Sequence, residues 1–238
     1  MGLTKQEDIA KTWGSHQPLL KAVLEVLKPK SAVECGCGDF STPHMKWIPY
    51  LTTIEHDPRW AKIIQNEYPW RLGKIDENSP GGVKKSPIKW NWYIERFEAK
   101  NPTRISELPT GEFDNICYYY QRLATEFKPF DLLFVDTFTA CRVPAVLYLG
   151  TLAEYIIIHD LEPPGPEVYE WERLDDFLKG WKQYLHKPMG HVGNGHQIPW
   201  TGLFSRKEIP LDELNKAMEP ESIRLWKEHT PLVEMTND

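Results

Sequence analysis

Glycines, carboxylates and hydroxyls are concentrated in the stretch "VECGCGDFST", residues 33–42. Glu34 stands two positions before Gly36, and Gly38 follows after one further residue. Glu55 lies 17 positions after Gly38, at the end of the next apolar run, "LTTIE". A glycine turn lets the backbone approach a ligand closely, and a carboxylate at the next strand end can accept hydrogen bonds from ribose hydroxyls. The spacing therefore predicts a nucleoside-binding turn.

Two cofactor classes use such a turn, and electrostatics separates them. A nicotinamide enzyme requires GxGxxG, but the third glycine position counted from Gly36 is Ser41. A carboxylate such as Glu34 directly before the turn is also unfavourable beside a pyrophosphate. It suits a positively charged cofactor without phosphate, and this favours S-adenosylmethionine.

The surrounding pattern predicts an alternation of strands and helices that begins with a βαβ unit. Ser15 is expected to cap the first helix, Ser41 or Thr42 to cap the second with Pro43 at its first position, and Asp57 to cap the third. The expected elements in this half are a helix at 17–27, a strand at 31–35, a helix from 43, a strand at 51–55 and a helix at 58–68.

The second half continues the alternation after an interruption. Residues 70–76 are assigned to a third strand, and residues 77–110, with four prolines, to an irregular insertion with one short helix. The run "FDLLFVD" has the continuous apolar character of a central parallel strand. The remaining expected elements are helices at 113–127 and 140–153, strands at 130–136 and 155–160, a rigid loop at 161–166, a helix at 168–185, an antiparallel hairpin within 189–207, and a helical or loose tail from 210.

Taken together, "VECGCGDFST", "TTIEHDPRW", "FDLLFVD" and "YIIIHD" resemble the class I S-adenosylmethionine-dependent methyltransferases. The closing "NGHQIPWTGLFSRK" is similar to the terminal antiparallel hairpin of that family, so the resemblance covers about residues 15–205. It implies an α/β fold: a Rossmann-like, doubly wound, seven-stranded, mostly parallel sheet with an antiparallel C-terminal hairpin. We expect one domain over residues 1–238, with a Pro/Trp-rich insertion at about 77–110 and a C-terminal extension at about 207–238.

The resemblance also implies the residues that hold the cofactor. Glu34 and the Gly36–Gly38 backbone would bind the methionine part, Glu55 the ribose, and Asp136 would lie beside the methionine end. Phe40 stands where the family has a third glycine, and Asp76 is the acidic residue assigned to the adenine. The full cofactor-binding set is Glu34, Gly36, Cys37, Gly38, Ser41, Thr42, Glu55, His56, Asp76 and Asp136.

Methyl transfer is an in-line displacement that a protein accelerates mainly by positioning the two partners, and a base is needed only for a hydroxyl or a protonated amine. The groups at the ends of the two central strands, Asp136, His159 and Asp160, are the predicted catalytic residues. Arg142 could pair with a carboxylate of the cofactor or the acceptor, or cap a helix.

The same strand ends raise the question of a metal. Asp136 and Asp160 could hold Mg²⁺, but His159 weakens that match because magnesium prefers oxygen ligands. The four cysteines lack zinc-site spacing. We therefore predict no metal ligand.

The composition bounds the acceptor. The formal net charge is −6, and the tetrapeptides "DPPY" and "NPPF" and a Pro-Cys pair are absent, which disfavours nucleic acid. A small-molecule acceptor, methylated on oxygen, is the expectation. One basic span, from Arg71 to Arg104, is either a solvated insertion or a cap that faces the substrate. No apolar run of membrane-spanning length and no signal pattern occur, so we expect a cytoplasmic protein without membrane contact.

Three other functions remain open. An aminopropyltransferase-like enzyme of the same fold would need several carboxylates to line a polyamine site. A non-catalytic nucleoside-binding protein would keep only the pocket, and an NAD-dependent oxidoreductase is the third alternative.

Overall fold

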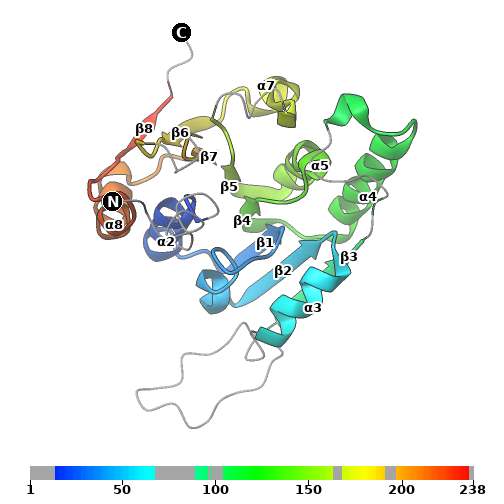
Figure 1. The fold of residues 1–238 in the computed structure, drawn as a ribbon, viewed down its shortest axis with the longest axis horizontal. Coiled ribbons are helices and arrows are strands. Elements are labelled where there is room, and N and C mark those ends of the chain that lie inside the picture. The colour runs from blue at the N-terminus through cyan, green and yellow to red at the C-terminus, as the bar shows by residue number, and fades with distance from the viewer. Residues whose placement is uncertain are drawn as a thin grey trace.

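A computed structural model describes residues 14–67, 89–95, 97, 104–162, 168–190 and 197–235. Its centre is an eight-stranded sheet in the order β3-β2-β1-β4-β5-β7-β6-β8 (Figure 1). The first five strands of that order run parallel, and β7, β6 and β8 continue with antiparallel pairing. The strands are β1 Ser31–Cys35, β2 Tyr50–Glu55, β3 Lys89–Ile94, β4 Phe130–Val135, β5 Ala153–His159, β6 Lys182–His186, β7 Thr201–Ser205 and β8 Leu232–Glu234.

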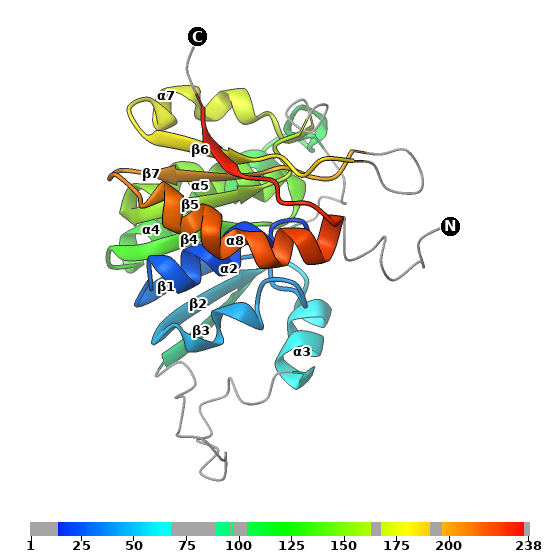
Figure 2. The same cartoon turned by 90° about the vertical axis from the view of Figure 1, so that its left-hand side faces the viewer.

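Helices cover both faces of the sheet (Figure 2). The α-helices are α2 Gln17–Val26, α3 Pro58–Glu67, α4 Glu112–Glu126, α5 Thr139–Leu149, α7 Asp175–Leu178 and α8 Leu211–Trp226. Short 3₁₀ helices are η1 His44–Trp47, η3 Ile105–Glu107, η4 Gly150–Leu152 and η5 Trp171–Leu174. The expected α/β Rossmann-like sheet with an antiparallel C-terminal part is confirmed, with one strand more than the seven predicted.

The layering follows from the alternation of side chains along the central strands. In β4, Leu133 and Val135 pack with α4 and α5, whereas Leu132 and Phe134 pack with α2 and α8. Successive residues of a strand point to opposite faces, so a continuous apolar run must be covered on both sides. This is the arrangement that "FDLLFVD" predicts, and it places the end of β4 in the middle of the molecule.

The connection from β1 to β2 is shorter than predicted. Instead of a full helix from Pro43, only the 3₁₀ turn η1 forms, and Tyr50 already begins β2. The hydroxyls of Ser41 and Thr42 donate to Glu34 instead of capping a helix. The first helix, α2, forms as predicted with Pro18 in its first turn, but its N-cap is His16 and not Ser15.

The strand that pairs with β2 lies in a different segment from the predicted third strand. The predicted strand at 70–76 lies outside the described residues, and β3 is formed by Lys89–Ile94, inside the span expected to be irregular. Its sequence "KWNWYI" is rich in aromatic residues, which favour strands. The indole N–H of Trp90 donates to Thr53 Oγ1 of β2 at 3.0 Å, which fixes the edge strand beside β2.

The C-terminal region differs from its prediction in the helix and in the first strand of the hairpin. The single helix expected at 168–185 is replaced by η5 and α7, and the chain then turns at Gly180, with φ +85, into β6. The hairpin pairs β6 with β7, so its first strand lies before the predicted segment 189–207, and its expected tip at 193–195 lies outside the described residues. The extension after 207 is integral to the fold because α8 lies beside α2 and β8 pairs with β6 (Figure 2).

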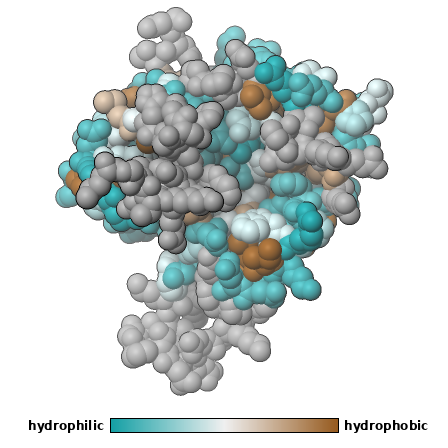
Figure 3. Space-filling model, in the orientation of Figure 1, coloured by the Kyte–Doolittle hydropathy of each residue, from teal (hydrophilic) through white to brown (hydrophobic). Residues whose placement is uncertain are grey.

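One face of the molecule can be judged for exposed apolar residues (Figure 3). On the face shown in Figure 3, the described residues are predominantly hydrophilic, with apolar residues in small separate patches. In the described part of the chain, no helix combines the length and the apolar character that crossing a membrane requires.

Gly36 is the position where the fold demands glycine. Its φ is +84, and a Cβ there would lie 2.0 Å from the carbonyl oxygen of Asp136. At Gly38, by contrast, an added Cβ would meet no atom within 4 Å. The turn after β1 thus packs directly on the end of β4.

We expect Gly36→Ala to lower the free energy of unfolding by about 2–5 kcal/mol, because strain at positive φ adds to a backbone clash. Gly38→Ala is the matched control, with an expected change below about 0.5 kcal/mol. Urea denaturation followed by circular dichroism measures both. Equal effects of the two substitutions would contradict the close packing of the turn on β4.

Candidate active site

The glycine turn uses its own backbone donors within the protein. The N–H of Gly36 donates to Ile54 O at 2.9 Å, that of Cys37 to Glu55 Oε2 at 3.1 Å, and that of Gly38 to Thr42 Oγ1 at 2.8 Å. A pyrophosphate at such a turn depends on free backbone N–H groups and on the N-terminus of a following helix. Here all three N–H groups are donated internally, and only a 3₁₀ turn follows.

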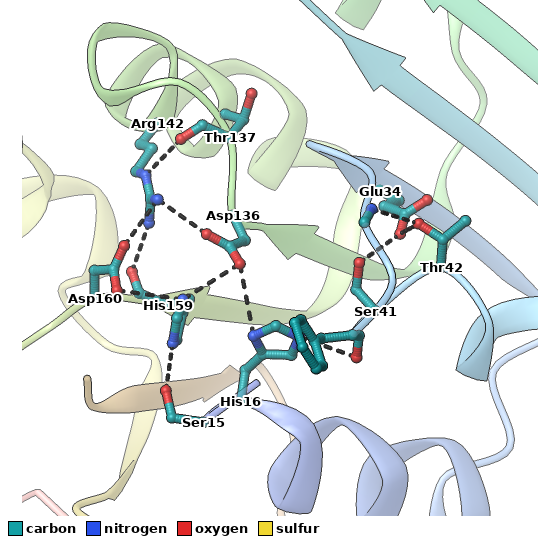
Figure 4. A network of polar contacts seen from close by, with 12 residues as sticks. Ser15, His16, Glu34, Ser41, Thr42, Asp136, Thr137, Arg142, His159 and Asp160 are labelled. Carbon is teal, nitrogen blue, oxygen red and sulfur yellow. Dashed lines mark hydrogen bonds and ion pairs between the residues drawn. The ribbon is translucent and has the colours of Figure 1, made fainter. Parts of the chain in front are cut away.

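Glu34 is buried beneath the turn, with no exposed surface (Figure 4). It accepts hydrogen bonds from the hydroxyls of Ser41, Thr42 and Thr53 at 2.9, 2.7 and 2.9 Å. A buried carboxylate needs such donors because each unsatisfied oxygen is costly. Glu34 therefore links the turn, through Ser41 and Thr42, to Thr53 of β2. That Glu34, Ser41 or Thr42 contacts a cofactor stays a prediction.

Glu55, at the end of β2, holds the other side of the turn. Its carboxylate accepts the N–H groups of His56 and Asp57 at 2.8 and 2.9 Å, in addition to that of Cys37. Burial raises the pKa of Glu55, but the His56 side chain and these N–H groups outweigh burial and lower the pKa below its ordinary value. The thiol of Cys37 donates to Oε2 at 3.3 Å, and a thiol is a weak donor that a hydroxyl can replace.

At the ends of β4 and β5, Asp136 and Asp160 share one guanidinium (Figure 4). Nη2 of Arg142 lies 2.9 Å from Asp136 Oδ1 and 2.8 Å from Asp160 Oδ2. The same side chain donates through Nε to Thr137 O and through Nη1 to His159 O. The sequence suggested that Arg142 either pairs with a ligand carboxylate or caps a helix. In the structure it is buried and does neither, because its guanidinium is occupied by the two aspartates and two backbone carbonyls. It links two strand ends.

His159 lies between the two aspartates. Its Nδ1 is 3.3 Å from Asp136 Oδ2 and 3.3 Å from Asp160 Oδ1, and its Nε2 is 2.7 Å from Ser15 Oγ. Burial lowers the pKa of His159, but the charges of Asp160 and Asp136 outweigh burial and raise the pKa to about 9. The arrangement therefore brings together the three predicted catalytic residues.

Two neighbours of this cluster were missed by the sequence analysis. His16 Nδ1 lies 3.5 Å from Asp136 Oδ2, and Ser15, expected as a helix cap, is completely buried against His159. Burial and the nearby His159 lower the pKa of His16 to about 3. No motif marked these residues, because they precede α2 and lie more than 100 positions from Asp136 in the chain.

Asp160 is held in an uncommon conformation. Its φ is +64, in the left-handed region, and its carboxylate accepts the Tyr169 hydroxyl at 3.0 Å. The indole N–H of Trp171 donates to the Asp160 carbonyl at 3.1 Å, and the Arg142 guanidinium lies 4.5 Å from the centre of the Tyr169 ring. Non-glycine residues at positive φ persist where the surroundings hold them, and they cluster at functional sites. Tyr169 and Trp171 thus fix Asp160.

The remaining predicted residues are placed as follows. His56 stacks on Phe138 with ring centres 5.0 Å apart, next to Glu55. Asp76 lies outside the described residues. Because β3 ends at Ile94, the acidic residue after the third strand is Glu95, whose N–H donates to Glu55 O at 3.1 Å. Glu95 lines an open groove of about 720 Å³ together with Phe97, Tyr118 and Arg122.

Comparison with known proteins is informative only through solved structures, since neither a family model nor a curated protein matches this sequence. A protein from Klebsiella pneumoniae that is assigned as an O-methyltransferase superposes with a TM-score of 0.52 at 13% identity, covering 81% of this chain and 80% of that one. The O-methyltransferase TomG from Streptomyces achromogenes, involved in tomaymycin synthesis and solved with S-adenosylmethionine, gives 0.51 at 13% identity, with 81% and 80% covered.

The chain has the fold of the S-adenosylmethionine-dependent methyltransferases. In this methyltransferase fold, the glycine turn after β1, Glu55 after β2 and the aspartates after β4 and β5 all lie at the carboxyl ends of parallel strands. Ligands of open α/β sheets bind at this edge, outside the strand ends. The predicted residues that the structure describes therefore gather where the fold places its ligand.

We expect Arg142→Met to destabilise the protein by about 3–5 kcal/mol, because it leaves two buried carboxylates without their shared cation. Arg122→Met is the control. It breaks an exposed pair with Glu126, so its expected cost is below about 1 kcal/mol. Urea denaturation compares the two, and a small effect of Arg142→Met would show that Asp136 and Asp160 do not need the guanidinium.

The lowered pKa of Glu55 makes its contribution to stability depend on pH. The contribution is present above the ordinary value of 4.5 and is lost as the pH falls through the lower pKa of the folded state. Glu55→Gln should therefore be less stable than the unmodified protein at about pH 6, and the difference should shrink toward about pH 3. Glu126→Gln, at an exposed site, is the control. A difference that stays constant over this range contradicts the assignment.

Proposed function

We propose that this protein is an S-adenosylmethionine-dependent methyltransferase that methylates a hydroxyl oxygen of a small molecule. The observation that carries the proposal is the turn after β1, whose three backbone N–H groups are donated to the protein and which has two buried carboxylates, Glu34 and Glu55, behind it. Such a turn suits a cationic nucleoside without phosphate.

The described residues fit this cofactor. The open space at Gly38 leaves room for a ligand against the backbone, and Glu55 can accept a ribose hydroxyl in place of the weak bond from the Cys37 thiol. Asp136, whose side chain is 24% exposed, stands beside the turn for the methionine end. Glu95 directly follows β3 and is our candidate for the adenine side, while the prediction for Asp76 lies outside the described residues. The cofactor itself supplies an activated methyl group on its sulfonium.

The charges at the strand ends bear on the acceptor. Burial raises the pKa of Asp136, but His159 and Arg142 outweigh burial and hold the pKa well below its ordinary range. Asp136 is therefore a weak base, and His159, with a pKa of about 9, is protonated at neutral pH. General-base catalysis is efficient when the pKa of the base is near the working pH. An acceptor that ionises readily, such as a phenol, matches a site that orients and receives an oxyanion beside the methyl group.

The other functions fit less well. An NAD-dependent oxidoreductase would need free backbone N–H groups at the turn to bind a pyrophosphate, but those of Gly36, Cys37 and Gly38 are donated within the protein. An aminopropyltransferase would need unpaired carboxylates for a polyamine, whereas Asp136 and Asp160 are both paired with Arg142. A non-catalytic nucleoside-binding protein would share the pocket and differ only in turnover.

Calorimetric titration with S-adenosylhomocysteine and with NAD tests the cofactor. We expect binding of the first and not of the second, and Gly38→Ala should weaken binding by about tenfold or more while leaving stability unchanged, since its Cβ would occupy the cofactor's space. Lys216→Ala, at an exposed position in α8, is the control.

Transfer of a labelled methyl group to a panel of phenols then separates an enzyme from a binding protein. Turnover on a phenol supports the proposal. Tight binding of S-adenosylhomocysteine without turnover on any acceptor favours the non-catalytic alternative, and binding of NAD at the turn overturns the cofactor assignment.

A further inference from the structure

We propose that His16, Asp136 and His159 form a binding site for one divalent transition-metal ion of the zinc type. This inference goes beyond the proposed function, because a metal can bind these residues whether or not the protein transfers a methyl group. It also differs from the sequence-based expectation, which predicted no metal ligand and considered only magnesium at Asp136 and Asp160.

Ligand atoms of the three residues come close together. One ring nitrogen of each histidine and a carboxylate oxygen of Asp136 all lie within 4.8 Å of one another. Nδ1 of His16 is 3.5 Å and Nδ1 of His159 is 3.3 Å from Asp136 Oδ2. Ligands bound tetrahedrally at about 2.0–2.1 Å from zinc are about 3.3–3.4 Å apart. The two nitrogen–oxygen separations are close to this value.

Both Nδ1 atoms are buried, and the contacts recorded for them within the described part of the chain are with carboxylate oxygens, of Asp136 for both and also of Asp160 for His159. The opposite ring nitrogens are held: His16 Nε2 lies 3.2 Å from Phe40 O, and His159 Nε2 lies 2.7 Å from Ser15 Oγ. Because a carbonyl oxygen can only accept, Nε2 of His16 is the protonated nitrogen, and its Nδ1 lone pair faces the Asp136 carboxylate. A lone pair beside an anionic oxygen is unfavourable, and a cation between them removes the conflict.

The ligands come from three separate elements, and other residues orient each of them (Figure 4). His16 is the N-cap of α2, Asp136 follows β4, and His159 ends β5. Arg142 holds Asp136 through its other oxygen, Oδ1, so Oδ2 remains directed at the histidines. Hydrogen bonds that fix the second nitrogen of a ligating histidine are a regular feature of metal sites. The histidines are thus positioned before any ion arrives.

The donor set selects the kind of ion. Two imidazoles and one carboxylate suit zinc and its neighbours in the first transition row, whereas magnesium requires oxygen ligands in octahedral geometry. Asp160 is held by Arg142 and Tyr169 through Oδ2, and its Oδ1 lies 3.3 Å from His159 Nδ1, but it is not one of the three residues whose ligand atoms come together. Asp136 is partly exposed, so the site has three protein ligands and an open side, as catalytic zinc sites do.

In the metal-free protein, protonated His159 is held between Asp136 and Asp160, and a bound ion would displace the proton on Nδ1. The rival explanation is that this metal-free cluster is the only state of the three residues. The two explanations differ in what the purified protein does with a metal alone. Titration of the metal-stripped protein with Co²⁺, followed by visible absorption, and with Zn²⁺, followed by calorimetry, distinguishes them without cofactor or acceptor. A failure of methyl transfer therefore leaves this test unaffected.

We expect one Co²⁺ or Zn²⁺ per chain, a visible cobalt spectrum, and Mg²⁺ binding weaker than Zn²⁺ by about a hundredfold or more. His16→Gln and Asp136→Asn should each weaken Zn²⁺ binding by at least about tenfold. His44→Gln, at a half-buried histidine in η1, should leave the affinity unchanged.

Circular dichroism melting establishes whether each variant is folded. If the variants unfold, the Co²⁺ and Zn²⁺ titrations of the unmodified protein test the proposed site. The absence of stoichiometric Co²⁺ or Zn²⁺ binding to the unmodified protein overturns the inference. The inference is also overturned if His16→Gln, like His44→Gln, leaves the affinity for Zn²⁺ unchanged.

Discussion

Four carboxylates, Glu34, Glu55, Asp136 and Asp160, lie at the carboxyl ends of neighbouring parallel strands with little exposure to water. Their desolvation and mutual repulsion are the constraint that organises the site, because a buried charge must be paired or hydrogen-bonded. The protein meets this requirement in three ways. Hydroxyls surround Glu34, backbone N–H groups and His56 bind Glu55, and one guanidinium joins Asp136 to Asp160.

These solutions also determine what the site can bind. The backbone N–H of Cys37 donates to Glu55 and that of Gly38 donates to the Thr42 hydroxyl, so neither N–H can donate to a phosphate. The short 3₁₀ helix η1 also provides no long helix N-terminus. Negative charge behind the turn favours a cation in front of it. His159 at the end of β5 and His16 before α2 both direct Nδ1 at Asp136, so both proposed ligands, a sulfonium nucleoside and a metal ion, are positively charged.

Much of the fold could be predicted from local patterns. Apolar runs such as "FDLLFVD" identify central strands because both of their faces are covered, and Asp57 does cap α3 by accepting the N–H of Arg59 at 2.8 Å. The third strand was misplaced because the prolines around "KWNWYI" suggested a loop, while pairing with β2 decided the outcome. The prediction of a helix at 168–185 is wrong because the end of this segment forms β6, which is stabilised by pairing with β7. The periodicity within the segment does not reveal this partner.

The candidate site was predictable where it depends on strand ends and not where it depends on distant contacts. Glu55, Asp136, His159 and Asp160 follow apolar runs, so parallel strands bring them to one edge. Nothing in the sequence near His16 or Tyr169 indicates that tertiary packing brings them to the same cluster. Arg142 was recognised as a charged residue near the site, but its role as a bridge required the position of Asp160.

A crystal structure of the protein with S-adenosylhomocysteine tests the central claim most directly, since that claim concerns where a phosphate-free nucleoside lies. The account predicts the ribose hydroxyls within hydrogen-bonding distance of Glu55, in the place of the Cys37 thiol, and the amino acid part over Gly38 toward Asp136. A nucleoside bound away from the β1 turn, or a ribose without contact to Glu55, would contradict it.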